Sequence, residues 1–348
     1  MRNRLGLALA GAALLTGLVT VQAQKGRLNP VIDLLVQKKP VFGLYAPSNR
    51  RPGGPGGRGG AQAGAPAAPT TPSQSQPPPP QPAPPQKTAA ELAAEAVAYK
   101  NTDFVFDGSM EGGLQRALPA FTDLMKGLQA AGAVSKSPLR LTHPVIVKTP
   151  ELDEPTIHAD IATQLNLGVS GLMLPKAESA DQVQKAIAAM RFKSKGGTRP
   201  DSVGSAPAFW GMSEAEYKAK ADVWPLNPDG ELINWTIVES KEGLAKVREI
   251  AAVKGIGVLW PGAGTLRGVF TTTTASGERQ FDEKGWEAAI QTVLAACKEF
   301  KVACGYPANA TDIETRMKQG FNVFVMQWGD QGFKAIDVGR KASNRATN

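Results

Sequence analysis

The chain has 348 residues, a formal net charge of +8, and only two histidines and two cysteines. This length fits one large domain with additional segments, and the two cysteines exclude a zinc site of the usual spacing. Nucleic-acid binding is not indicated, because no basic run is interleaved with aromatic residues and Arg340, Lys341 and Arg345 fall in an expendable tail.

The N-terminus has the features of a secretory signal peptide, predicted over residues 1–23. Two arginines precede an apolar run at 5–21, and a small-residue cleavage site ends at Ala23. Such a segment is removed from the mature protein and does not stay in the membrane. We therefore expect an exported protein, in the bacterial periplasm as first choice.

The mature chain, residues 24–348, is predicted to be one domain with an insert. A short helix at 29–36 precedes a first strand at 40–45. From about 46 to 87, Pro, Gly, Gln, Ser and Ala dominate. Such a composition buries too little apolar surface to offset the entropy of ordering, so we predict a disordered linker.

The rest of the sequence alternates short apolar strands with amphipathic helices. Strands are predicted at 103–107, 144–149, 170–174, 231–240, 257–260, 302–306 and 322–327. Helices are predicted at 88–99, 113–133, 154–167, 180–190, 243–252, 284–300, 311–319 and from about Gly332, with a shorter one at 213–221. Strand-then-helix units of this kind are typical of parallel sheets. We predict an α/β fold, a (β/α)8 TIM barrel, with the linker inserted after strand one.

The strand at 231–240 ends in an acid. Its alternation places Trp235, Ile237 and Glu239 on one face, so a carboxylate follows a file of large apolar side chains. Glu239 is either a site residue or an acid that suits the helix beginning after Ser240.

Charged residues follow several predicted strands. Active sites of TIM barrels lie at the carboxyl ends of the strands, which places Lys148, Lys176 and Glu239 around one mouth, with Glu111 just past strand two. Carboxylates and cations there suit an oxyacid substrate, with Mg²⁺ or Mn²⁺ as a compatible metal. Lys148 is either a partner for a substrate carboxylate or a solvated lysine, and we expect Lys176 to be solvated.

Glycines end the strand at 257–260. They would let a ligand approach the backbone closely and leave amide N–H groups free to hold a carboxylate, or they form an ordinary turn. Cys297 and Cys304 are predicted to be buried, unpaired thiols, because the helix and strand that carry them run antiparallel.

Several segments resemble the HpcH/HpaI aldolase and citrate lyase β-subunit family. Residues 165–183 resemble its segment around "GLM" and proline, and Ile237-Val238-Glu239 resembles its strand-five metal motif. The resemblance implies a TIM barrel and a homo-oligomer. It also implies a divalent metal (Mg²⁺, Mn²⁺ or Co²⁺) that stabilises the enolate of pyruvate or a related oxyacid while a carbon–carbon bond is made or broken.

The resemblance also implies roles for individual residues. Glu239 matches the metal ligand, and Glu111 matches an acid that orients metal-bound water. Lys148 stands where the family has an arginine that clamps the keto-acid, and it lacks the bidentate fork. The backbone at Ala263 and Gly264 would hold the pyruvyl carboxylate.

Other family positions are changed in this sequence. Gly264 replaces the aspartate that is the second metal ligand, and Gly112 replaces a histidine that handles protons. Asn166 replaces an aspartate of the third helix. Two functions are therefore compatible with the sequence: a carbon–carbon lyase acting on a small oxyacid, and a degenerate barrel that binds an oxyacid or a periplasmic partner.

Overall fold

A computed structural model describes residues 26–49 and 85–347. The predicted signal peptide and most of the predicted linker lie outside these described residues. At the edges of the linker, Asn49 and Lys87 are hydrogen-bonded to each other in both directions: Asn49 Nδ2 donates to Lys87 O at 2.7 Å, and Lys87 N donates to Asn49 Oδ1 at 2.8 Å. The chain therefore leaves and re-enters the domain at one place.

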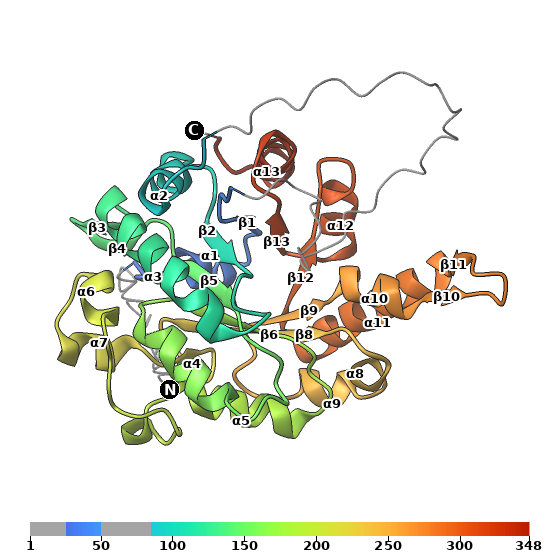
Figure 1. Cartoon of the computed structure of the whole chain (residues 1–348), viewed down its shortest axis with the longest axis horizontal. Coiled ribbons are helices and arrows are strands. Elements are labelled where there is room, and N and C mark those ends of the chain that lie inside the picture. Colours follow the sequence, from blue (N-terminus) through green and yellow to red (C-terminus); the bar gives the residue numbers. More distant parts are fainter. Residues whose placement is uncertain (1–25, 50–84, 348) are drawn as a thin grey trace, which may run out of the picture.

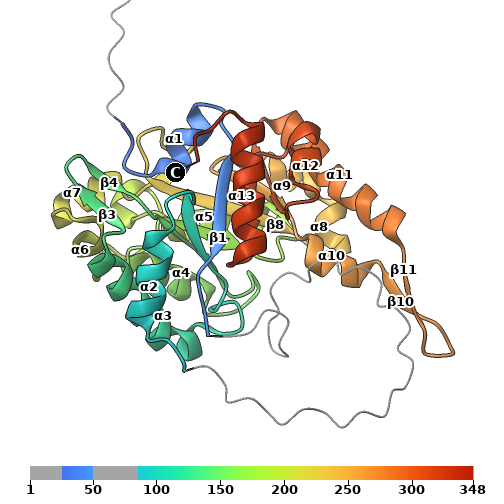
Figure 2. The same ribbon diagram turned by 90° about the horizontal axis from the view of Figure 1, so that it is seen from above.

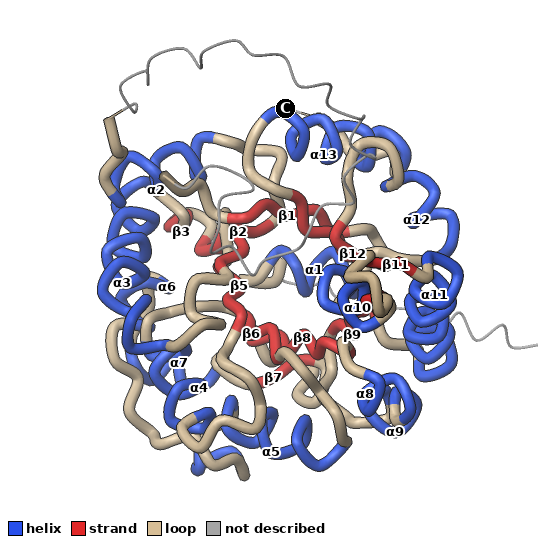
Figure 3. The backbone as a smooth tube through the Cα atoms, turned by 45° about the vertical axis from the view of Figure 1, so that its right-hand side comes forward, coloured by secondary structure: helices blue, strands red, loops and turns tan. Residues whose placement is uncertain are grey.

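Eight parallel strands form a closed barrel, which confirms the predicted fold. They are β1 (Val41–Tyr45), β2 (Phe104–Asp107), β5 (Val145–Lys148), β6 (Gly171–Leu174), β8 (Leu232–Val238), β9 (Val258–Pro261), β12 (Ala303–Pro307) and β13 (Val323–Met326). Each strand pairs in parallel with the next of this series, and β13 pairs with β1. Figure 3 shows the resulting ring of strands inside a ring of helices.

The outer helices follow the predicted positions closely (Figure 1). They are α2 (Ala89–Ala98), α3 (Leu114–Ala131), α4 (Ile157–Asn166), α5 (Ala180–Met190), α8 (Lys241–Ala245), α9 (Val247–Ala251), α11 (Glu283–Phe300), α12 (Ile313–Gln319) and α13 (Asp330–Ala342). The helix predicted at 243–252 is in fact the pair α8 and α9, divided at Lys246. None of the helices in the described part of the chain is long and apolar enough to cross a membrane.

The barrel interior is filled with large apolar side chains. On β8, Trp235 and Ile237 face this interior, whereas Leu232 and Val238 pack outward against the helices, as the alternation predicts. The Trp235 ring stacks on Trp260 at a centroid distance of 5.6 Å. Helix α1 (Pro30–Val36) packs its apolar residues into the same cluster and closes the amino-terminal end of the barrel (Figure 3).

Several short elements were not predicted. They are the hairpin of β3 (Val134–Lys136) and β4 (Leu139–Leu141), helix α6 (Ala206–Trp210), strand β7 (Val223–Trp224), helix α10 (Ala263–Val269), and the hairpin of β10 (Thr271–Thr273) and β11 (Arg279–Phe281). The short helix predicted at 213–221 is α7 (Glu214–Lys220). The β10–β11 hairpin stands away from the barrel (Figure 2).

The prediction of two unpaired cysteines was wrong. Cys297 and Cys304 form a disulfide across a Cα–Cα distance of 5.7 Å. Helix α11 ends at Phe300, and Lys301 takes a left-handed conformation with φ of 56°. The chain therefore turns back sharply, and the start of β12 returns beside the last turn of the helix, where the two cysteines meet.

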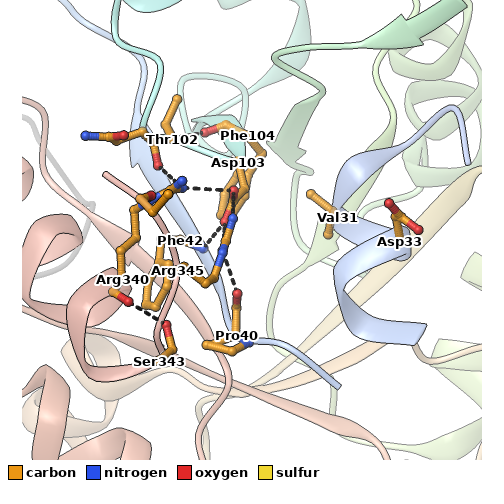
Figure 4. Close-up of polar contacts among 12 residues, drawn as sticks. Val31, Asp33, Pro40, Phe42, Thr102, Asp103, Phe104, Arg340, Ser343 and Arg345 are labelled. Carbon is orange, nitrogen blue, oxygen red and sulfur yellow. Dashed lines mark hydrogen bonds and ion pairs between the residues drawn. The ribbon is translucent and has the colours of Figure 1, made fainter. Parts of the chain in front are cut away.

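The prediction of an expendable C-terminal tail was wrong for Arg345 and Arg340 (Figure 4). Arg345 binds both carboxylate oxygens of Asp103 at 2.6 Å each and also donates to Pro40 O at 2.7 Å. Arg340 donates to Asn101 O at 2.9 Å. The tail is thereby fixed to the segments that begin β1 and β2.

Candidate active site

Three of the predicted site residues meet at the mouth of the barrel. Lys148 is the last residue of β5, Glu239 directly follows β8, and Glu111 lies in the loop after β2. Lys148 Nζ donates to Glu111 Oε1 at 2.6 Å and lies 4.0 Å from Glu239 Oε1. The lysine ammonium therefore stands beside both carboxylates.

The cluster is partly withdrawn from solvent. The side chains of Lys148 and Glu239 are only 13% and 8% exposed, and that of Glu111 is 26% exposed. Burial raises the pKa of Glu111; Lys148 opposes this rise, and the charges of Glu239 and Glu151 add to it. Charges in such a site interact more strongly than they would on the open surface.

Two backbone features fix Glu239. Oε1 accepts a hydrogen bond from the backbone N–H of Lys176 at 3.0 Å, and Lys176 holds a left-handed conformation with φ of 51°. On the other side, Gly262 packs against the carboxylate so closely that a Cβ there would lie 2.4 Å from Glu239 Cβ and 2.6 Å from Oε2. The glycine after β9 therefore makes room for a protein side chain.

The side chain of Lys176 points away from the cluster. Its Nζ pairs with Glu151 at 2.8 Å and with Asp153 at 3.3 Å. Both of these acidic side chains are exposed to solvent. Lys176 thus contributes its backbone N–H to the site, whereas its ammonium lies outside the cluster, among the exposed acids.

Ala263 and Gly264 lie at the start of α10, next to Gly262. Ala263 is buried, and its carbonyl accepts a hydrogen bond from Trp286 Nε1 at 2.8 Å. As the first residues of a helix, both have N–H groups without an acceptor inside the helix.

Sequence reasoning missed Tyr45 as a site residue, and it also missed the contact of Gly262 with Glu239. Tyr45 ends β1, and its ring meets Phe106 edge-on at a centroid distance of 4.9 Å. Burial raises the pKa of its hydroxyl, and the nearby charges of Glu111 and Asp107 add to the rise. Its position at a carboxyl strand end was the available signal, whereas the contact of Gly262 with Glu239 left none.

The residues at this mouth do not fit a divalent metal. Gly264 supplies no carboxylate, and no group of three or more His, Cys, Asp or Glu side chains suited to a metal occurs within residues 26–49 and 85–347. Mg²⁺ takes six oxygen ligands in near-octahedral geometry, usually one or two protein carboxylates together with waters. Here the ammonium of Lys148 already lies beside both candidate carboxylates and would repel a second cation.

Fold and cluster together define a TIM barrel with a polar site at the carboxyl ends of its strands. The sequence profile of the HpcH/HpaI aldolase/citrate lyase family matches residues 120–337, and the chain belongs to this family. No curated protein sequence matches the chain.

Solved structures of the family share the fold at low sequence identity. An HpcH/HpaI aldolase/citrate lyase family protein from Burkholderia cenocepacia J2315 matches with a TM-score of 0.59 and 20% identity, covering 86% of this chain and 92% of that one. The HpcH/HpaI aldolase from Desulfitobacterium hafniense DCB-2 has a TM-score of 0.55 and 15% identity, covering 85% and 89%. Macrophomate synthase has a TM-score of 0.52 and 19% identity, covering 73% and 80%.

Proposed function

We propose that the protein is a carbon–carbon lyase of the aldolase type that acts on a small oxyacid at the mouth of its barrel. The observation that carries this proposal is the partly buried cluster of Lys148 between Glu111 and Glu239. Membership of the aldolase/citrate lyase family supports the reaction class.

The mechanism that we propose uses the groups of the protein itself. The ammonium of Lys148 holds the anionic oxygens of the substrate, and the N–H groups of Ala263 and Gly264 bind its carboxylate. Glu111 takes the proton of the substrate hydroxyl while the carbon–carbon bond breaks. The hydroxyl oxygen becomes the carbonyl of the second product, the electron pair of the broken bond passes into the enolate, and the enolate carbon takes the proton back from Glu111 to give the oxyacid. General acid–base catalysis of this kind contributes about a hundred- to ten-thousand-fold to rate.

The test is proton–deuterium exchange of the pyruvate methyl group, followed by NMR. This exchange reports enolate formation without a second substrate. We expect exchange with the wild type, a loss of at least about a hundredfold in Glu111→Gln, and no change in Glu242→Gln, which alters an exposed acid on α8. Absence of exchange in folded protein, both with EDTA and with Mg²⁺, Mn²⁺ or Co²⁺, would refute the lyase.

A second candidate function is an oxyacid-binding or partner-binding barrel without turnover. It is favoured by Gly112 and Gly264, which carry no side chain where the family has a histidine and an aspartate. This candidate predicts oxyacid binding without exchange at the pyruvate methyl group.

We also propose that the protein is exported to the periplasm and forms a homo-oligomer. The Cys297–Cys304 disulfide supports the first proposal, because disulfides persist mainly in oxidising compartments. Mass spectrometry of the periplasmic fraction should find a mature chain beginning at Gln24, and light scattering of that protein should give a mass above that of one chain. A cytoplasmic full-length chain or a monomer would refute the respective proposal.

A further inference from the structure

We propose that the ammonium of Lys148 takes the place of a divalent metal in this barrel, so that the site binds its oxyacid without any metal ion. This inference rests on the proposed function, since it concerns the same oxyacid site. It follows from the poor fit between the residues of the mouth and a metal.

The first step concerns the hydrogen bonds of Lys148. An ammonium has three N–H donors. One is directed to Glu111 Oε1 at 2.6 Å, whereas Glu239 Oε1 at 4.0 Å lies beyond hydrogen-bond length. In the described part of the chain, Nζ has no other hydrogen bond. Lys148 can therefore donate to two substrate oxygens, which is the task that a metal performs for a chelated keto-acid.

The second step concerns the space around Glu239. One of its oxygens accepts the N–H of Lys176 at 3.0 Å and faces Lys148. The other lies against Gly262, where a Cβ would approach to 2.6 Å. Both oxygens of this carboxylate are thus confined by the protein, and a hydrated metal ion would have to displace one of these neighbours.

The third step concerns how Glu239 and Glu111 act on Lys148. Glu239 is nearly buried and its Oε1 lies 4.0 Å from Lys148 Nζ, so the carboxylate attracts the ammonium toward this side of the mouth. Glu111 completes the orientation by accepting the short hydrogen bond. In oxyacid binding, both acids thereby position Lys148, in addition to the role of Glu111 as the proposed base.

The test uses oxalate, a planar dianion that resembles the enolate of pyruvate, with protein stripped of metal by EDTA. We expect calorimetry to detect oxalate binding to the metal-free wild type. Lys148→Met should raise the Kd for oxalate by on the order of a hundredfold, because a partly buried charge pair is lost. Lys148→Arg keeps the charge and should restore part of the affinity. Lys185→Met removes an exposed cation of α5 and should change nothing.

Mn²⁺ binding, measured by electron paramagnetic resonance, is the second readout. The wild type should bind Mn²⁺ weakly, and Lys148→Met should bind it more tightly, because the two carboxylates then face each other without a cation. Circular dichroism establishes that each variant is folded, and Lys148→Gln serves if the methionine variant is not.

These binding experiments distinguish a failure of metal-free oxyacid binding from a failure of the proposed lyase activity. Oxalate binding that depends on Lys148 in metal-free protein supports the inference, even if pyruvate shows no exchange and the lyase fails. Oxalate binding or pyruvate exchange that requires Mg²⁺ or Mn²⁺ overturns the inference and leaves the lyase standing. Oxalate binding that is unaffected in Lys148→Met also overturns it.

Discussion

At the scale of single residues, Gly262 is the position where one added carbon should disable the site. A Cβ at this position would collide with Glu239 at 2.4 Å. We predict that Gly262→Ala shifts Glu239, raises the Kd for oxalate by about tenfold or more, and lowers the free energy of unfolding by about 1–3 kcal/mol. Calorimetry and urea denaturation measure these two effects.

Gly268→Ala is the matched control for Gly262→Ala. Gly268 lies in α10, the helix that begins directly after Gly262, and a Cβ there would meet nothing within 4 Å. The control should bind oxalate like the wild type. Equal affinity in both alanine variants would show that the position of Glu239 does not matter for binding.

Arg199 is a buried cation that has no carboxylate partner among residues 26–49 and 85–347. It is 1% exposed, and its Nη2 donates to Asn166 Oδ1 at 2.7 Å and to the hydroxyl of Tyr217 at 3.3 Å. Its Nε and Nη1 have no hydrogen-bond partner in the described part of the chain. Its guanidinium lies 4.3 Å above the Phe192 ring. An unpaired buried charge destabilises the folded state.

We therefore predict that Asn166→Asp stabilises the protein. The new carboxylate would give Arg199 a charge-assisted hydrogen bond and raise the free energy of unfolding near neutral pH by about 1–3 kcal/mol. Urea denaturation measures the gain, which should vanish in an Arg199→Met background. A loss of stability in the single variant would contradict this account.

The sequence predicted which charged residues share the site but not the contacts that shape it. Lys148 and Glu239 were predicted together because parallel strands of a barrel end at one mouth. The fit of Gly262 against Glu239 depends on the register of β8 with β9, which pairs Val238 with Pro261, and no local pattern encodes that register. The same holds for Arg199, whose partners come from three separate segments.

At the scale of elements, Asp222 connects the irregular passage before β7 to the end of α5. Its carboxylate receives two hydrogen bonds from Arg191, at 2.6 and 3.1 Å, and one each from Asn227 and the Val223 N–H, both at 2.9 Å. Burial alone would raise the pKa of Asp222, but these hydrogen bonds outweigh it and lower the pKa. Ionised Asp222 therefore stabilises the folded state.

The pH dependence of this contribution has a definite sign. Because the folded pKa lies below the unfolded value of about 3.9, the stabilisation is complete above that value and is lost as pH falls through the folded pKa. We predict that Asp222→Asn is less stable than the wild type by about 2 kcal/mol at pH 7, with a smaller gap below about pH 4. Urea denaturation across pH tests this, with exposed Asp229→Asn as control. A gap that does not change with pH would contradict it.

The elements that the sequence predicted are those with a long periodic pattern. All eight barrel strands and the longer helices were found, because apolar alternation and capping residues such as Thr88 mark them locally. Hairpins of three-residue strands, such as β10 with β11, carry too few residues for a period. The disulfide was missed because it depends on the turn at Lys301. This residue is left-handed, but the sequence has a lysine there instead of the glycine that usually marks such a turn.

At the scale of the whole molecule, the two ends of the barrel differ in the kinds of residues that they carry. The charged cluster lies at the carboxyl ends of the strands, whereas the amino-terminal end is closed by α1 and tied by both termini of the described chain. Near the N-terminus, buried Glu231 accepts hydrogen bonds from the backbone of Leu28 and Asn29, at 3.3 and 3.0 Å. Near the C-terminus, Arg345 donates two hydrogen bonds to the carboxylate of Asp103 (Figure 4). The ties of both termini thus lie at the end of the barrel opposite the charged cluster.

The last prediction concerns this C-terminal tie. Asp103 also accepts the Phe42 N–H at 2.8 Å, so Arg345, Asp103 and the start of β1 form one network. The side chains of Arg345 and Asp103 are only 13% and 7% exposed. Arg345→Ala leaves a nearly buried carboxylate without its bidentate partner, and we predict a loss of about 2–4 kcal/mol in the free energy of unfolding.

Comparison among three variants makes this prediction specific. Arg345→Lys keeps the positive charge but cannot donate two parallel hydrogen bonds to Asp103. Its stability should therefore fall between those of the wild type and Arg345→Ala. Lys341→Ala removes an exposed cation from the same tail and should unfold like the wild type. Because the tie lies at the end of the barrel opposite Lys148, the folded Arg345→Ala protein should keep the oxalate affinity of the wild type. Wild-type stability in Arg345→Ala would mean that the tail does not hold the barrel, and weakened oxalate binding would mean that the two ends are coupled.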